Sequence, residues 1–352
     1  MLRFLDSFEW INVGLSNIPL RNKLFEKYAA GSISSSTSRI IDVDGSNRLQ
    51  LSGFSQSIET TDLVDLDLTN NVVTVGFNVL TPSNFVNSLI TEIRTGSTSA
   101  DRIYVGLNTS GQLALVTTYG PTATTVLLAD FTTLSPNTEY YLEFKFNVSD
   151  SGSFECRVDG TEVTSEVGLD YLQGETYVGW RRVRFGTFGA SCWYDNIYVT
   201  DGTGSQNDSF LGPTVVRMVL PTSQGVTNNW DASDASTTDH HLLVDDVASD
   251  GNTTFLEGDT SGEEETFGFE DLVVPPGDVT GVIVSTTLSA SGAGSDVSVT
   301  VNDGTTGMDF SVGNVTDTSF LHYTAILENN PITGLAWDEA TFNAMQFGVK
   351  ID

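Results

Sequence analysis

Two groups of closely spaced polar residues have types and spacing that could bind a metal ion. They are Asp42, Asp44 and Asn47, in an Asp-x-Asp-Gly-x-Asn pattern, and Asp245, Asp246 and Asp250. Calcium takes about six to eight oxygen ligands, which aspartate side chains and loop carbonyls can supply together. Asp, Asn and Gly are also the residues from which tight turns are built. Both groups are therefore calcium candidates, with turn formation as the competing interpretation.

A second kind of site, for sugars, is suggested by aromatic residues with polar neighbours. Exposed aromatic rings stack on sugar faces while nearby polar groups supply hydrogen bonds. The candidate residues are Trp193, Tyr194, Asp195 and Asn196, which are consecutive in the sequence. Tyr119 and Trp230 are further aromatic candidates. For each ring, a place in the core or in an interface is the competing interpretation.

The carboxylates that could hydrolyse a glycan are predicted to lie too far apart. A glycan hydrolase needs two carboxylates roughly 5 to 10 Å apart. Glu139 and Glu143 occupy positions i and i+4 of a predicted strand, which places them about 13 Å apart. His240 and His241 are adjacent, and on a strand they would point to opposite faces, so the pair alone cannot form a two-histidine metal site. We predict a loop position for them instead. We therefore predict that the chain is not an enzyme, with a glycan hydrolase as the least favoured alternative.

The elements that position these residues are predicted to be strands. Apolar and polar side chains alternate from Tyr141 to Val148 and again from Phe154 to Val158, the period of two of a strand with one buried face. Asp159-Gly160 follows, and this dipeptide readily adopts the positive φ angles of a tight hairpin turn. The stretch 139–163 is therefore predicted to be three antiparallel strands.

Further segments with the same alternation occur along the whole chain. They are residues 40–43, 49–51, 73–79, 103–107, 113–115, 178–185 (with Arg181, Arg182 and Arg184 between apolar residues) and 193–199 in the first half, and residues 215–220, 267–272, 282–288, 297–301, 308–310, 323–327 and 346–351 in the second half. The one predicted helix of the second half is short, from Glu339 to Met345, with Asp338 as its N-cap. We predict an all-β fold with a β-sandwich at residues 1–200, a small, polar linker at 201–212 and a smaller acidic β domain at 213–352.

Charge is uneven along the chain. The net charge is −31, and residues 201–352 contain only two basic residues, Arg217 and Lys350. Such a surface repels nucleic acid and anionic membranes, because binding there requires Lys and Arg. The acidic surface either keeps the protein soluble or carries calcium. No stretch is apolar for the roughly 18 residues of a membrane span, and no secretion signal is expected at Met1–Asp6.

The two cysteines, Cys156 and Cys192, are 36 residues apart. Cys156 shares the apolar face of its predicted strand with Phe154 and Val158, so a buried thiol is favoured. Their spacing does not indicate a metal site, and a disulfide between them is left open.

The first half resembles the concanavalin A-like jelly roll of legume lectins, laminin G modules and many glucanases. The matching segments are residues 140–146, residues 154–163 and residues 193–199. The resemblance implies a jelly-roll sandwich followed by a smaller acidic β-sandwich or barrel.

Over nearly its whole length the chain resembles a family of structural proteins of tailed bacteriophages with a laminin G-like jelly roll. The matching segments are residues 3–8, 210–213, 219–221, 244–246, 330–334, 336–337 and 346–350, with Trp230 and Asp250. The resemblance implies a virion component made in the host bacterial cytoplasm and exposed on the particle, as a capsid decoration, head fibre or tail-associated fibre. Expected partners are other virion proteins, further copies of the chain and host surface glycans. The alternative is a carbohydrate-binding, lectin-like adhesin.

Overall fold

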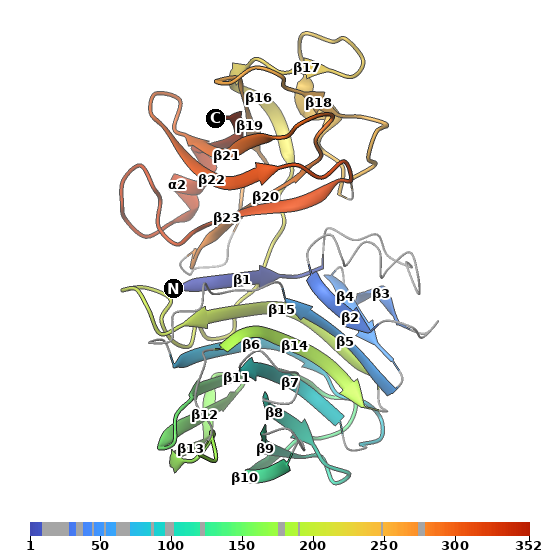
Figure 1. Cartoon of the computed structure of the whole chain (residues 1–352), viewed down its shortest axis with the longest axis vertical. Coiled ribbons are helices and arrows are strands. Elements are labelled where there is room, and N and C mark those ends of the chain that lie inside the picture. Colours follow the sequence, from blue (N-terminus) through green and yellow to red (C-terminus); the bar gives the residue numbers. More distant parts are fainter. Residues whose placement is uncertain are drawn as a thin grey trace. The chain divides into compact units, whose positions relative to one another are not determined.

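The structure is a computed structural model that describes residues 1–8, 28–32, 38–43, 46–52, 54–60, 71–85, 88–95, 102–119, 124–174, 180–188, 191–247, 249–273 and 279–352. It divides into two compact units, Met1–Val216 and Arg217–Asp352. Both are built almost entirely from antiparallel strands (Figure 1). No helix among these residues is long and apolar enough to cross a membrane.

Unit 1 is a jelly-roll sandwich of two large antiparallel sheets. Sheet A has the strand order β13-β12-β11-β6-β15-β4-β3, with β1 also paired to β15. Its strands are β1 (Leu2–Asp6), β3 (Arg39–Val43), β4 (Ser46–Leu51), β6 (Val72–Leu80), β11 (Glu139–Asn147), β12 (Gly152–Val158), β13 (Thr161–Leu169) and β15 (Cys192–Asp201). Pairing of strands distant in sequence, such as β6 with β15, gives the sheet its crossover connections.

Sheet B lies on the other side of the core and has the order β10-β9-β8-β7-β14-β5-β2. Its strands are β2 (Tyr28–Ser32), β5 (Phe54–Thr60), β7 (Ser88–Thr95), β8 (Arg102–Leu107), β9 (Gln112–Tyr119), β10 (Thr124–Thr133) and β14 (Trp180–Phe188). Side chains alternate between the two faces of each strand. In both sheets, one set of alternate side chains forms the core and the other set faces outward.

The core between the sheets is aromatic at its centre. Phe77 contacts Phe144, Phe185 and Tyr194 with ring centroids 5.5 to 6.0 Å apart, so rings from both sheets meet there. Such aromatic pairs stabilise a core by about 0.5–1.5 kcal/mol each beyond the area they bury. Cys156 and Cys192 are both buried in this core and are not joined in a disulfide.

The predicted three-stranded stretch is confirmed. Strands β11, β12 and β13 pair in order, and Asp159 and Gly160 adopt φ angles of 51° and 77° between β12 and β13. The Asp159 carboxylate also accepts a hydrogen bond from the Tyr141 backbone N–H at 2.8 Å. The turn is thereby fastened to the strand beyond its own hairpin.

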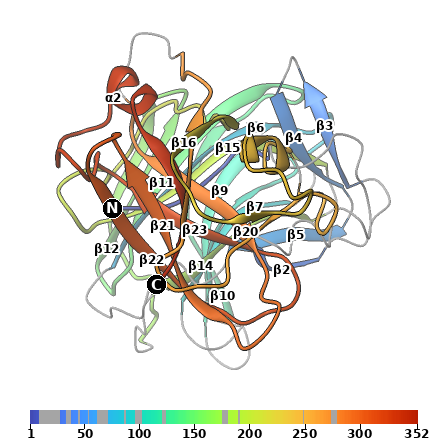
Figure 2. The same ribbon diagram turned by 90° about the horizontal axis from the view of Figure 1, so that it is seen from above.

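Unit 2 is a smaller arrangement around a five-stranded sheet C, in the order β16-β19-β24-β21-β22. Its elements are β16 (Pro221–Asn228), β17 (Asp231–Ala232), the 3₁₀ turn η1 (His240–Leu243), β18 (Leu256–Glu257), β19 (Glu264–Phe269), β20 (Val282–Leu288), β21 (Ser295–Asn302), β22 (Gly307–Val315), β23 (Leu321–Leu327), α2 (Glu339–Asn343) and β24 (Gln346–Ile351). Strands β20 and β23 pair separately. Figure 2, at 90° to Figure 1, shows α2 at the margin of this unit.

The predicted helix and its cap are confirmed. The Asp338 side chain accepts from the Thr341 N–H, and the Thr341 hydroxyl accepts from the Asp338 N–H, a capping box. The helix contributes Phe342 to a core that also contains Trp337 and Phe347. The indole of Trp337 donates to the Leu327 carbonyl, so its polar atom is satisfied inside the core.

One prediction at the junction is wrong. Residues 215–220 are not a strand, and the first strand of the second unit is β16, which begins at Pro221. Residues 209–212, at the end of the predicted linker, are bound to sheet A by side chains of its outer face. Alternation alone did not show that these backbone groups find partners on another element.

Candidate functional site

The outward side chains of sheet B bring arginines from three neighbouring strands into one row. Arg182 of β14 pairs with Arg94 of β7, and Arg94 pairs with Arg102 of β8. The row continues to Thr118 of β9. Adjacent strands are about 4.8 Å apart, so the three arginines form a regular line of cations across the sheet. We call the outer side of sheet B around this line the arginine face.

A second row runs beside the first. Arg184 of β14 pairs with Glu59 of β5 on one side and with Glu92 of β7 on the other, and Glu92 pairs with Tyr104 of β8. Core residues Val183 and Ile93 alternate with these positions, which places the charged side chains on the opposite face of the sheet.

The carboxylates lie beneath the arginines. The side chains of Glu92 and Glu59 are 0% and 5% exposed, whereas the arginine side chains are between 16% and 33% exposed. Arg94 Nε lies 2.9 Å from Glu92 Oε1 and 3.3 Å from Glu59 Oε2. Arg182 Nη1 lies 3.1 Å from Glu59 Oε1, and Arg102 Nη1 lies 3.5 Å from Glu92 Oε2. Two buried acids thus hold four arginines in place.

The arginine face keeps an excess of positive charge and of hydrogen-bond donors. Four guanidinium groups over two carboxylates leave a net charge of +2 in a chain whose net charge is −31. Arg94, Arg102 and Arg184 alone carry about 15 N–H donors, more than two carboxylates with about eight acceptor positions can engage. The face can therefore bind a further anion.

Tyr104 adds an aromatic ring to this face. The Arg102 guanidinium lies 5.9 Å from the centre of the Tyr104 ring, within cation–π range. Burial raises the pKa of Tyr104, Arg102 opposes that shift and Glu92 adds to it. The phenol therefore stays protonated and can donate a hydrogen bond. Burial also lowers the pKa of Arg184, although Glu92 opposes this effect.

The outer face of sheet A is partly covered by the chain itself. Leu211 N–H donates to the Tyr198 hydroxyl at 3.2 Å, and Gly212 N–H donates to Glu143 Oε1 at 2.9 Å. The guanidinium of Arg157 lies 4.0 Å from the centre of the Phe210 ring. Glu143 is completely buried, although it lies on the polar side of an alternating strand, where we would expect a solvated side chain. Of the two sheets, sheet B has the outer face with charged side chains suited to a charged ligand.

The predicted glycan-binding stretch does not form an exposed aromatic platform. Tyr194 is fully buried, and its hydroxyl donates to the Ile90 and Gly186 carbonyls. Asp195 is 2% exposed and accepts from the Asn196 N–H. Trp193 is half-buried on the same strand, and Asn196 accepts from the Val216 N–H. Period-two alternation puts Tyr194 into the core, where its ring cannot stack on a sugar.

The second predicted calcium group does not converge. Asp250 accepts from the Thr254 hydroxyl at 2.9 Å and from the Thr254 N–H at 3.3 Å, which is turn chemistry. Asp246 Oδ2 lies 3.5 Å from the same Thr254 hydroxyl, but no three His, Cys, Asp or Glu side chains of the described residues are grouped so that they could hold a metal ion.

The first calcium group remains a prediction. Asp44 and the side chain of Asp42 lie outside the described residues. The backbones of Asp42 and Asn47 face each other across the β3–β4 hairpin, which joins the two predicted segments 40–43 and 49–51.

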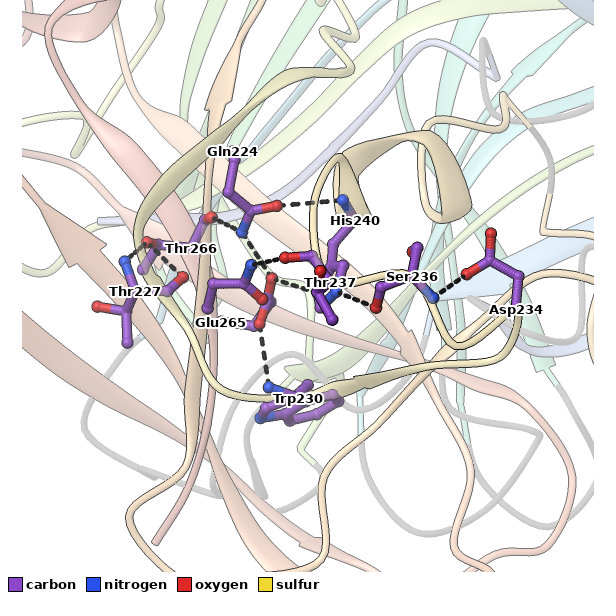
Figure 3. Close-up of polar contacts among 10 residues, drawn as sticks. Gln224, Thr227, Trp230, Asp234, Ser236, Thr237, His240, Glu265 and Thr266 are labelled. Carbon is purple, nitrogen blue, oxygen red and sulfur yellow. Dashed lines mark hydrogen bonds and ion pairs between the residues drawn. The ribbon is translucent and has the colours of Figure 1, made fainter.

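A buried polar cluster occurs in unit 2, around Glu265 of β19 (Figure 3). The carboxylate accepts from Gln224 Nε2 at 2.7 Å and from the Trp230 N–H at 3.1 Å. His240 Nδ1 lies 3.1 Å from Glu265 Oε1, and the Glu265 and His240 side chains are 0% and 3% exposed. His240 lies in the η1 turn and not in a strand, as predicted, but its side chain is buried. Glu265 is likewise buried, on strand β19.

The arginine face was only partly visible in the sequence. Arg182 and Arg184 were recognised as basic residues of one strand, but Arg94 and Arg102 are single arginines in separate segments. A signal was present, since each lies on the polar side of an alternating segment in an acidic chain. Their meeting depends on the order β8-β7-β14, which local patterns do not encode.

No protein family and no curated protein sequence matches the chain. Similar solved structures include alginate lyase Aly36B (12% identity, TM-score 0.38, covering 56% of this chain and 95% of that one). Another is the endo-β-1,4-glucuronan lyase of the fungus Trichoderma reesei (12% identity, TM-score 0.40, covering 59% of this chain and 98% of that one). A third is the carbohydrate-binding module CBM66 of Bacillus subtilis (12% identity, TM-score 0.30, covering 46% of this chain and 90% of that one).

This finding corrects two predictions. The similar structures are two polysaccharide-degrading enzymes and a carbohydrate-binding module, and none of these is a virion protein. The prediction of a non-enzymatic bacteriophage component is therefore wrong in its main interpretation, and so is the prediction that the chain is not an enzyme.

Proposed function

We propose that unit 1 binds an acidic glycan on the arginine face. The observation that carries the proposal is the register of Arg182, Arg94 and Arg102 on three adjacent strands. A line of guanidinium groups at strand spacing suits a linear polymer that carries an anion on its repeating units. Guanidinium binds carboxylate and sulfate through paired N–H donors, a geometry that lysine lacks.

The surrounding residues support the same assignment. Glu59 and Glu92 hold the arginines from below, so little side-chain freedom is lost when a ligand binds. Tyr104 offers a ring and a hydroxyl next to Arg102. The exposed Thr125 continues the polar surface next to the buried Thr118, with hydroxyl oxygens 3.4 Å apart. Cations, hydroxyls and an aromatic ring together are the groups that recognise a charged sugar.

The test is binding of the full chain to immobilised polymers of known charge. Polygalacturonate supplies carboxylates, a sulfated dextran supplies sulfates, and unmodified dextran supplies neither. We expect binding to at least one acidic polymer and none to neutral dextran. Analysis of polymer length after the same incubations shows whether the bound chain is cut.

Variants locate the site. Arg102→Ala removes an arginine that lies 3.5 Å from Glu92 and beside the Tyr104 ring, and we expect affinity to fall about 10- to 100-fold. Arg102→Lys keeps the charge but loses the paired donors, so a smaller loss is expected. The matched control is Arg39→Ala, which removes an exposed arginine of sheet A. Equal loss in Arg102→Ala and Arg39→Ala would refute the proposed site.

A further inference from the structure

A row of four side chains crosses the outer face of sheet A. Trp193 of β15 pairs with Gln50 of β4 on one side and with Leu80 of β6 on the other. Leu80 in turn pairs with Glu139 of β11. The four strands are neighbours in the sheet (Figure 1). Adjacent strands are about 4.8 Å apart, so the row is about 14 Å long. We call these four residues the tryptophan row.

The tryptophan row faces outward. The core residues Cys192 and Tyr194 lie on either side of Trp193 in the chain, and alternation turns the Trp193 side chain to the opposite face of the sheet. Trp193 and Leu80 are both partly exposed, and the Glu139 side chain is 45% exposed. An aromatic ring and a leucine therefore form an apolar floor that a ligand can reach, with a carboxylate at one end.

An ion pair lies beside this row. Arg48 Nη1 lies 2.9 Å from Glu139 Oε2, and Arg48 Nε lies 3.9 Å from Asp195 Oδ2. Asn78 Nδ2 donates to Glu139 Oε1 at 3.5 Å. Asp195 and Asn78 pair with each other across β15 and β6, one row further along the same face. Polar side chains with both donors and acceptors thus follow one side of the tryptophan row.

The charge of the arginine is balanced on this surface. Arg48 has two carboxylates in reach, those of Glu139 and Asp195, whereas on the arginine face four arginines share two. An anionic sugar therefore meets no excess of positive charge here. An uncharged sugar can instead stack on the indole and form hydrogen bonds with the guanidinium and the carboxylate.

We propose that the tryptophan row binds an uncharged, β-1,4-linked glycan. In such a chain the rings carry equatorial hydroxyls and form a flat ribbon, with apolar C–H faces and hydroxyls along its edges. A face of the ribbon fits on Trp193 and Leu80, and an edge fits against Arg48 and Glu139. This inference does not rest on the proposed binding of an acidic glycan, because that site lies on sheet B.

The experiment is titration calorimetry of the full chain with two glucose oligomers of equal length. Cellohexaose has β-1,4 links and a flat shape, whereas isomaltohexaose has the flexible α-1,6 links of dextran. We expect cellohexaose to bind at least about 10-fold more tightly, because the rings of the flexible oligomer must be ordered on binding. Equal affinity for both oligomers, or no binding of cellohexaose, would overturn the proposal.

Variants locate the site on sheet A. Trp193→Ala should lower the affinity for cellohexaose about 10- to 100-fold, and Trp193→Phe, which keeps a smaller ring, should lower it less. Glu139→Gln should also weaken binding, because it removes the charged partner of Arg48. The matched control is Glu166→Gln, which changes an exposed glutamate of β13 in the same sheet.

Thermal unfolding of each variant shows whether it is folded under the conditions of the titration. If Trp193→Ala does not fold, Trp193→Phe and Glu139→Gln still test the site, because both changes preserve most of the side chain. Wild-type affinity for cellohexaose in both of these variants would overturn the proposed site, as would an equal loss in Glu139→Gln and Glu166→Gln.

Discussion

At the scale of single residues, Glu92 is the group on which the arginine face depends. It is fully buried, yet it lies within 4 Å of Arg94, Arg102 and Arg184. In Glu92→Gln one oxygen is replaced by an NH₂ group that faces guanidinium donors. Because donors then oppose donors, we expect unit 1 to lose about 1–3 kcal/mol of unfolding free energy.

Urea unfolding of both proteins measures this loss. The control is Glu166→Gln on β13, whose side chain is exposed, and it should change stability by less than about 0.5 kcal/mol. If Glu92→Gln behaved like this control, the carboxylate would not be what holds the arginines. Glycan affinity should fall in Glu92→Gln as well, because the arginines lose their fixed positions.

Asp201 should make the stability of unit 1 depend on acidic pH. Burial opposes its ionisation, but hydrogen bonds from Thr203 and the ion pair with Arg3 outweigh burial and lower the pKa of Asp201 from 3.8. A group with a lowered folded-state pKa contributes its full stabilisation above its unfolded-state pKa, near 4, and loses it as pH falls through the folded-state value.

The variant Asp201→Asn measures that contribution. At pH 7 we expect it to be less stable than the wild type by about 1.5–3 kcal/mol, the range for hydrogen bonds to a charged group. The difference should shrink below pH 4, where the wild-type carboxyl becomes protonated. Urea unfolding of both proteins between about pH 2.5 and pH 7 measures this pH dependence, because the range includes the pKa of the carboxyl group. A stability difference that does not change with pH would argue against the ion pair.

At the scale of elements, the segment 209–212 is held to sheet A by one buried pair. Tyr198 donates to Glu143, and both accept backbone N–H groups of the segment. Gly76 leaves room for this arrangement, since a Cβ there would lie 2.0 Å from the Tyr198 ring. Tyr198→Phe keeps the ring but removes the hydroxyl. We expect a loss of about 1–3 kcal/mol and faster proteolysis between residues 201 and 216.

Limited proteolysis followed by mass spectrometry identifies where the variant is cut. Tyr323→Phe, on β23 of unit 2, removes a hydroxyl outside this contact and should be cut like the wild type. Cutting of Tyr198→Phe at the wild-type rate would mean that the segment is held by Lys145 and Arg157 instead.

The elements themselves were largely predictable from alternation. Residues 139–163 gave three strands in the right order, because one buried face and the Asp159-Gly160 turn are local properties. The burial of Glu143 was not predictable, since its partner Tyr198 lies 55 residues further along the chain. A charged residue on the polar side of a strand is predicted to be solvated unless the segment that covers it is known.

At the scale of the whole molecule, sheet order decided what the sequence could not show. The arginine face needs β7 between β8 and β14, and the cluster of unit 2 needs Gln224, His240 and Glu265 in one place. Each set comes from separate segments, and no spacing in the sequence relates them. Charge, by contrast, was readable from the sequence, and its division is uneven: unit 1 has a net charge of −11 and unit 2 of −20.

That charge leads to an unusual salt dependence for glycan binding. Basic proteins lose affinity for polyanions as salt rises, but this chain repels a polyanion at long range and attracts it only at the arginine face. The screening length falls from about 30 Å at 0.01 M to about 8 Å at 0.15 M salt. Added salt therefore weakens the repulsion by the whole chain more than the arginine contacts, which act within hydrogen-bonding distance.

We therefore expect the association rate with an acidic glycan to rise between about 0.01 and 0.15 M salt, while the dissociation rate changes little. Surface-based kinetics with the full chain on immobilised polygalacturonate measures both rates. Arg102→Ala should dissociate faster at every salt concentration, because it loses a contact and not the long-range field. An association rate that falls with salt would indicate that a basic surface outside the arginine face dominates binding, because steering of that sign requires a local excess of Lys and Arg.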